Sequence, residues 1–144
     1  YKDSFNKEWP VEVRPIDPVD LMNPEPKEPQ NYIWFKARSS LPDVVSLHQC
    51  VLAYMSDMTL LDVCTNPHGV NFMNPNIHSA SLDHAMWFHR PFKADDWLLY
   101  HQDSPSASGA RGFNRGSIFD LNGNLIASVA QEGLIRFTEN SKTQ

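Results

Sequence analysis

The sequence predicts an α+β domain in which an antiparallel β-sheet wraps around one long helix. Residues 41–63 carry apolar side chains at spacings of three and four, which predicts the helix, whereas most other segments show the alternation typical of strands. Because this helix is apolar on most of its faces, we expect other parts of the chain to enclose it. The length of 144 residues fits one domain with one sizeable core.

The first quarter of the chain predicts two strands separated by a loop. Residues 11–15, VEVRP, alternate in polarity and end at a proline, which favours the edge of a sheet. Residues 31–38, NYIWFKAR, are rich in aromatic and β-favouring residues and predict the second strand. Between them, residues 16–30 are polar and rich in proline, which excludes a helix and indicates a surface loop.

The predicted helix 41–63 follows, with Asp43 placed to cap its N-terminus. Four further strands are then predicted, joined by short loops: residues 78–92, 96–104, 110–120 and 124–137. The turn between the last two contains Asn122-Gly123, a strong hairpin signal because both residues tolerate positive φ.

Composition argues against several classes of protein. The 12 basic and 17 acidic residues are scattered, which is unlike a nucleic-acid binder. No run reaches the roughly 18 apolar residues of a membrane span and no secretory signal is recognisable, so we expect an intracellular protein.

If Cys50 and Cys64 lie on one helix, they are about 21 Å apart. That is too far for a disulfide, so we expect both to be reduced.

Four segments carry a more specific resemblance: YMSDM (54–58), SLDHAMWFHRPF (81–92), DDWLLYHQDSPSASGARGFNRGSIFD (95–120) and SVAQEGLIR (128–136). Together they resemble the second half of the type II acyl-CoA thioesterases, double hot-dog enzymes of bacteria and peroxisomes. The resemblance implies that residues 1–144 form a single hot-dog domain, the second half of such an enzyme. The start at Tyr1 rather than Met likewise suggests a trimmed product or a fragment.

Three polar residues stand out as candidates for chemistry. Asp57 interrupts the apolar helix pattern, Gln131 lies in an otherwise apolar strand row, and Ser81 lies in the predicted strand 78–92. From the residues alone, Asp57 could equally be a helix cap, Ser81 a solvated serine and Gln131 a satisfied core amide. The resemblance instead implies that the three act as the catalytic group, polarising a water that attacks a thioester carbonyl, with no metal or redox cofactor.

Other catalytic schemes fit the sequence poorly. There is no G-x-S-x-G motif, and neither cysteine has an evident base nearby. Asp83 and His84 would point to opposite faces of a strand, which disfavours a dehydratase pair. We interpret His89, which precedes Arg90, as a structural or surface histidine.

Residues 106–112, SASGARG, are small enough for a ligand to approach the backbone, although a tight bend or bulge explains them at least as well. Cations that could meet coenzyme A phosphates are Arg90, Lys93, Arg111 and Arg115.

The resemblance implies hydrolysis of fatty acyl-CoA to free fatty acid and coenzyme A, in a peroxisome or the cytoplasm. The alternative is a non-catalytic module that binds acyl thioesters. In either case we expect pairing with another hot-dog unit, the N-terminal half or a second copy, because a lone unit exposes a sheet edge.

Overall fold

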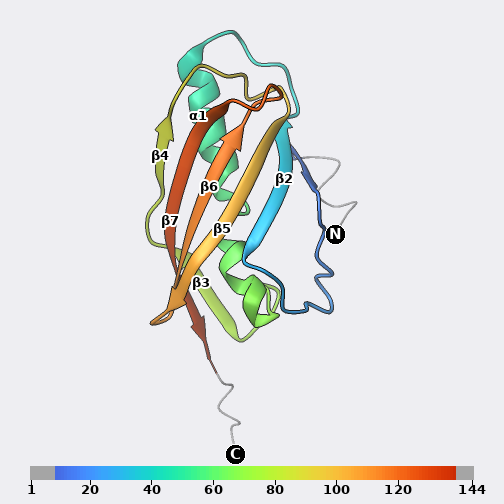
Figure 1. The fold of residues 1–144 in the computed structure, drawn as a ribbon, viewed down its shortest axis with the longest axis vertical. Helices are drawn as coiled ribbons and strands as arrows, with labels where there is room; N and C mark the ends of the chain where they lie inside the picture. The colour runs from blue at the N-terminus through green and yellow to red at the C-terminus, as the bar shows by residue number, and fades with distance from the viewer. Residues whose placement is uncertain (1–8, 139–144) are drawn as a thin grey trace, which may run out of the picture.

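The computed structural model describes residues 9–138, which form one curled antiparallel sheet around a central helix (Figure 1). The strands are β1 (Val11–Pro15), β2 (Gln30–Ala37), β3 (Ile77–Ser81), β4 (Ala85–Phe88), β5 (Leu98–Ser108), β6 (Arg111–Phe119) and β7 (Leu125–Phe137). The helices are α1 (Val45–Asp57) and the 3-10 helix η1 (Leu61–His68). The predicted α+β class is therefore confirmed.

The strands follow the order β1-β2-β5-β6-β7-β3, and β4 also pairs with β7. Every pairing is antiparallel. The sheet thus has β1 at one edge, as its proline predicts, and β3 with β4 at the other. Figure 1 shows α1 lying across the concave side of β5, β6 and β7.

The prediction of one strand over residues 78–92 is wrong, because the segment is divided into β3 and β4. Between them, the backbone N–H groups of Leu82 and Asp83 both donate to the carbonyl oxygen of Glu132. The Asp83 carboxylate then accepts a hydrogen bond of 2.7 Å from the Glu132 N–H. Residues 82–84 therefore lie opposite only two residues of β7, 131 and 132, so the chain carries one extra residue, a bulge, between β3 and β4.

The helix is shorter than predicted. It begins at Val45 and ends at Asp57, and the chain then tightens into η1. Asp43 is not the cap, because the N-cap residue is Val44 and has no side-chain hydrogen bond, while the Asp43 carboxylate lies 3.3 Å from Lys93 Nζ.

The core lies between α1 and the concave face of the sheet. Leu52 and Met55 of α1 are fully buried in one cluster with residues such as Ile118 and Val129. The opposite face of α1 is open, with Ser46, Cys50 and Tyr54 exposed at spacings of four. The expected enclosure therefore holds for one face of the helix only.

Glycines set how closely η1 approaches the sheet. A Cβ atom at Gly112 would overlap Cys64 Sγ, and one at Gly133 would overlap the Leu61 side chain. These two positions without side chains let η1 pack directly on the backbone of β6 and β7.

Other predictions concern turns and cysteines. The β6–β7 turn is present, with Gly123 at φ 80°. Cys50 and Cys64 are both free, the first exposed and the second buried. Within residues 9–138, no helix is long and apolar enough to cross a membrane.

Candidate functional site

The structure brings the three candidate residues together from three elements. Gln131 Nε2 lies 2.7 Å from Asp57 Oδ1 and 2.7 Å from Ser81 Oγ. Asp57 is the last residue of α1, Ser81 the last of β3, and Gln131 lies in the middle of β7. Residues separated by up to 74 positions in the sequence thus share one amide group.

Local structure explains each position. Alternation along β7 directs Ala127, Val129 and Gln131 to the concave face, as predicted, and all three are buried. The register pairs Ser81 with Gly133, so the serine lies one strand outward and two residues along from Gln131. Asp57, the last residue of α1, reaches the same amide with its carboxylate.

The donors and acceptors of this cluster are fixed by chemistry. An ionised carboxylate only accepts hydrogen bonds, so the Gln131 nitrogen must face Asp57. The two amide hydrogens are then committed to Asp57 and Ser81. Ser81 Oγ accepts one of them, which leaves its own hydrogen free for another acceptor. Gln131 Oε1 is buried and has no hydrogen-bond partner within residues 9–138.

The cluster is buried on the side of the sheet and open to solvent on the other side. Gln131 is fully buried, whereas the Asp57 side chain is 53 % exposed and Ser81 is exposed. Asp57 is not an N-terminal helix cap, because it ends α1 and η1 begins after Leu60. Gln131 is likewise not a fully satisfied core amide.

His84 also belongs to this cluster, which the sequence analysis missed. Its Nδ1 lies 3.6 Å from Asp57 Oδ1, and its Nε2 lies 2.8 Å from Ser56 Oγ. Ser56 Oγ also lies 3.0 Å from the Ala53 carbonyl oxygen, to which it can only donate. When the Ser56 hydroxyl donates to Ala53, His84 Nε2 is the donor to Ser56 Oγ, and in either tautomer His84 Nδ1 faces the carboxylate. The bulge that turns His84 inward was not visible in the strand pattern.

Two further buried amides lie on the concave face beside Gln131. Gln102 of β5 and Asn114 of β6 are fully buried, and Asn114 pairs in register with Gln131. Gln102 Nε2 donates to Thr59 Oγ1 at 2.7 Å. The amide oxygens of both residues lack partners within the described chain. The alternation of side chains along β5 and β6 would have been enough to predict this row of buried amides from the sequence.

The remaining candidates lie elsewhere. His89 is exposed and its Nε2 lies 2.8 Å from Ser128 Oγ, so it is a surface histidine as predicted. Burial raises the pKa of the Cys64 thiol to about 11, which keeps it neutral near pH 7. Residues 106–112 include a hairpin turn with Gly109 and Ala110 both at φ 60°.

Three of the four candidate cations already have acidic neighbours. The pairs are Lys93 with Asp43, Arg111 with Glu132, and Arg115 with Asp103. Arg90 is exposed beside the β4 end of the sheet. None of the four lies within the cluster around Gln131.

Solved structures with the same architecture define the class. A protein from Alicyclobacillus acidocaldarius described as having a hot-dog fold matches at a TM-score of 0.69 with 15 % identity, over 90 % of this chain and 47 % of that chain. At this identity the similarity shows the fold alone. Together with the curled sheet around α1, it makes this chain a hot-dog domain.

The family follows from closer matches. The model of the family Acyl-CoA thioesterase matches residues 1–134, so the chain belongs to the acyl-CoA thioesterase family. Acyl-CoA thioesterase 2 of Haemophilus influenzae is 39 % identical over 95 % of this chain and 48 % of its own length. Human acyl-coenzyme A thioesterase 8 is 40 % identical over 90 % of this chain and 40 % of its own length.

A crystal structure supports the same assignment. Acyl-CoA thioesterase II TesB2 from Mycobacterium marinum matches with a TM-score of 0.78 and 46 % identity, over 95 % of this chain and 52 % of that chain. The chain thus spans about half the length of the relatives it matches, as the resemblance to one half of a double hot-dog enzyme implies.

Proposed function

We propose that this chain is the second hot-dog unit of an acyl-CoA thioesterase and contributes the residues that hydrolyse fatty acyl-CoA to free fatty acid and coenzyme A. The observation that carries the proposal is the Gln131 amide, which bonds to both Asp57 and Ser81. A fully buried side chain that holds two exposed polar groups 2.7 Å away is suited to orienting them toward a ligand.

In the proposed reaction, Asp57 takes a proton from a water whose oxygen attacks the thioester carbonyl carbon. The resulting tetrahedral oxyanion collapses, the C–S bond breaks and the thiolate leaves with the bonding electrons. The proton held by Asp57 then passes to the thiolate, directly or through solvent. His84 Nδ1, 3.6 Å from Asp57, can stabilise the carboxylate when protonated.

Ser81 and Gln131 have different parts in this scheme. Both Gln131 hydrogens are committed, so its role is to hold Asp57 and Ser81 in place. The free hydroxyl hydrogen of Ser81 can orient the water or the carbonyl oxygen. Within the described chain no basic side chain hydrogen-bonds to Ser81, which argues against its acting as a nucleophile.

The replacement Asp57→Asn tests the proposal. Asparagine keeps the shape but cannot accept the proton, so kcat for acyl-CoA should fall by roughly 10²- to 10⁴-fold while KM changes far less. Release of free thiol gives the rate, and Asp96→Asn, at an exposed acid outside the cluster, is the control. A folded Asp57→Asn protein that hydrolyses acyl-CoA within a few-fold of the parent rate would contradict the proposal.

A non-catalytic acyl-thioester-binding module is the second candidate. The observation that favours it is the openness of the site, since Asp57 and Ser81 are exposed on this half alone. If the chain is such a binding module, calorimetry should detect binding of an acyl-CoA to the parent protein. The parent protein should then release no thiol, either alone or mixed with the N-terminal hot-dog half.

We also propose that another hot-dog unit, the N-terminal half or a second copy, covers this site. Tyr54, Leu82 and Trp87 are 57 %, 54 % and 53 % exposed, and all three lie on α1 or beside the β3–β4 edge. Exposed apolar side chains and an unpaired sheet edge favour association. Light scattering should therefore detect a dimer or larger species, and a stable monomer up to millimolar concentration would refute self-association.

The proposed compartment is a peroxisome or the cytoplasm. One relative, 30 % identical over 87 % of this chain, is named peroxisomal acyl-coenzyme A thioester hydrolase 1 of Saccharomyces cerevisiae. Imaging a fluorescent fusion beside a peroxisomal marker distinguishes the two. A secreted product would contradict both.

A further inference from the structure

The bulge between β3 and β4 decides which face of the sheet His84 joins. Ser81 pairs with Gly133 and Met86 with Val129, so both lie on the concave side of β7. Strict alternation from Ser81 would direct His84 and Met86 away from that side. The extra residue of the bulge reverses the alternation, so that His84 lies on the same face as Ser81.

The ring of His84 is anchored at one nitrogen and unpartnered at the other. Nε2 lies 2.8 Å from Ser56 Oγ, which ties the ring to the end of α1. Nδ1 is buried and has no hydrogen-bond partner within residues 9–138, although it lies 3.6 Å from Asp57 Oδ1. A lone pair on Nδ1 would face a negatively charged oxygen, whereas a hydrogen there would face an acceptor.

The geometry around His84 therefore favours a hydrogen on Nδ1. Two states of the ring supply it. In one, the Ser56 hydroxyl donates to Nε2 and the neutral ring carries its hydrogen on Nδ1. In the other, the Ser56 hydroxyl donates to the Ala53 carbonyl and both ring nitrogens of His84 are protonated.

The two side chains that face the Asp57 carboxylate address the same oxygen. Gln131 Nε2 lies 2.7 Å from Asp57 Oδ1, and His84 Nδ1 lies 3.6 Å from that atom. Within the described part of the chain, Asp57 Oδ2 has no hydrogen-bond partner, and the side chain is 53 % exposed. Groups from β7 and from the bulge thus converge on Oδ1 and leave Oδ2 free.

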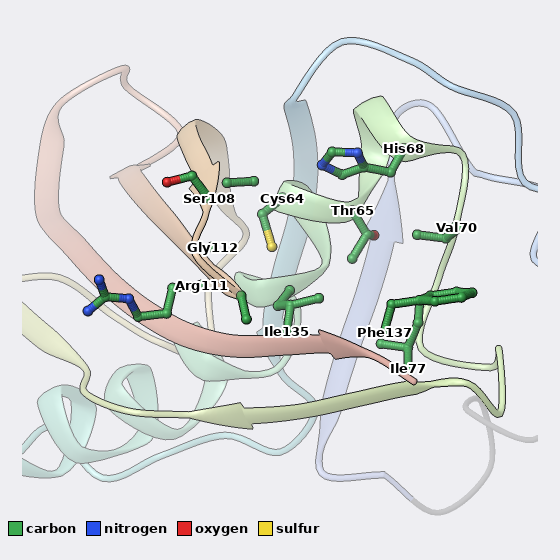
Figure 2. Close-up of a pocket in the computed structure, with 12 residues that line it drawn as sticks. Cys64, Thr65, His68, Val70, Ile77, Ser108, Arg111, Gly112, Ile135 and Phe137 are labelled. Carbon is green, nitrogen blue, oxygen red and sulfur yellow. The ribbon is translucent and has the colours of Figure 1, made fainter. Parts of the chain in front are cut away.

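Among the basic side chains of residues 9–138, His84 alone is paired with Asp57. His68, at the end of η1, lines a separate cavity of about 300 Å³ (Figure 2), whose lining contains no residue of the cluster around Gln131. His89 lies against Ser128 instead. A role beside the carboxylate therefore falls to His84.

We propose that His84 is a positioning residue, which holds Asp57 Oδ1 through a hydrogen on Nδ1 so that Oδ2 accepts the proton of the attacking water. The inference rests on the proposed function, because it assumes that Asp57 is the base. A separation of 3.6 Å is longer than a hydrogen bond, and we expect it to shorten when acyl-CoA binds. His84 acts through Asp57 and touches neither the water nor the thioester.

Two replacements distinguish the roles of the two ring nitrogens. In His84→Asn the amide lies near the place of Nδ1, so it keeps a donor for Asp57 and loses the contact with Ser56. In His84→Gln the longer amide takes the place of Nε2, so it keeps the contact with Ser56 and leaves Asp57 without this donor. His89→Gln is the matched control, because the exposed His89 Nε2 also lies 2.8 Å from a serine hydroxyl.

Thiol release from acyl-CoA gives kcat and KM for each folded variant. His84→Gln should lower kcat at least about tenfold and change KM by less than about twofold, because only the orientation of the base is lost. His84→Asn and His89→Gln should keep kcat within a few-fold of the parent. Equal rates of the two His84 variants, or a slower His84→Asn, would overturn the inference, since a purely structural role through Ser56 favours Gln.

The nitrogen-15 chemical shifts of the His84 ring test the inference without turnover. In the parent protein Nδ1 should show the shift of a ring nitrogen that carries a hydrogen, and the shift of a bare Nδ1 would overturn the inference. If Asp57→Asn is slow and His84→Gln is not, the inference fails and the proposed function stands. If the parent hydrolyses no acyl-CoA, the proposed function fails, and the Nδ1 shift alone decides whether His84 holds Asp57.

Discussion

The two halves of the concave face are built from opposite kinds of residue. Where α1 covers the sheet, Leu52 and Met55 pack among large buried apolar residues such as Ile118. Beyond the end of α1, the same strands present the buried amides of Gln102, Asn114 and Gln131 together with Gly112 and Gly133. One half therefore has the composition of a protein core and the other does not.

The two halves of the concave face contribute differently to the free energy of folding. A buried amide oxygen without a partner costs free energy of folding, and Gln102, Asn114 and Gln131 each have one within the described chain. The α1 half also holds such an atom, His48 Nε2, but its packing is dominated by apolar side chains. We interpret the α1 half as the part that keeps the domain folded and the amide half as the part kept for binding and chemistry.

The largest expected effect concerns the amide half. Gln131→Leu removes both hydrogen bonds that hold Asp57 and Ser81, so kcat for acyl-CoA should fall by about 10²- to 10³-fold, as for loss of one preorganised donor. Stability to urea should change little, because the unpartnered Oε1 is removed as well. The control is Gln30→Leu at an exposed position. Turnover within a few-fold of the parent would remove the functional distinction between the two halves.

An intermediate effect is expected in the α1 half. Leu52 is fully buried, so Leu52→Ala should lower the free energy of unfolding by about 2 to 5 kcal/mol. Urea denaturation measures this, and Val45→Ala, at the exposed first residue of the same helix, should change it by less than about 0.5 kcal/mol. The remaining folded protein should keep its kcat. If Leu52→Ala lowered kcat without lowering the free energy of unfolding, the assignment of stability to the α1 half and of chemistry to the amide half would be wrong.

The smallest effect is expected where the halves meet. Tyr100 is buried under α1, and its hydroxyl donates a 3.0 Å hydrogen bond to the Ser56 carbonyl, one residue before Asp57. Burial raises the pKa of this phenol, so the hydroxyl stays protonated. Tyr100→Phe should cost about 1 kcal/mol of stability and change kcat by no more than a few-fold. The control is Tyr32→Phe at an exposed position; equal effects of the two changes would show that the hydrogen bond to Ser56 contributes nothing.

The sequence predicted the strands and the face of Gln131 because alternation is a local property. Strand β7 and the burial of Ala127, Val129 and Gln131 follow directly from it. The end of α1 was not predictable in this way, since residues 58–63 continue the apolar helical pattern. The shift into η1 depends on Gly112 and Gly133, about 50 or more residues away, which accept Cys64 and Leu61.

The candidate site shows the same limit. Its three residues were selected by resemblance to a family, and their mutual distances follow from sheet register, which no local pattern encodes. His84 was missed because its orientation depends on a bulge against Glu132. The row of Gln102 and Asn114 was accessible from alternation, but its significance emerges only when adjacent strands are aligned.

Asp57 occupies the final position of α1, where the helix dipole disfavours a negative charge. A procedure that redesigned this domain for thermostability alone would replace it with lysine or asparagine and would also fill Gly133. Both changes follow sound engineering rules, yet the first removes the carboxylate that Gln131 holds and the second displaces Leu61. Attempts to stabilise this chain should therefore begin on the exposed side of β1 and β2 and leave these two positions unchanged.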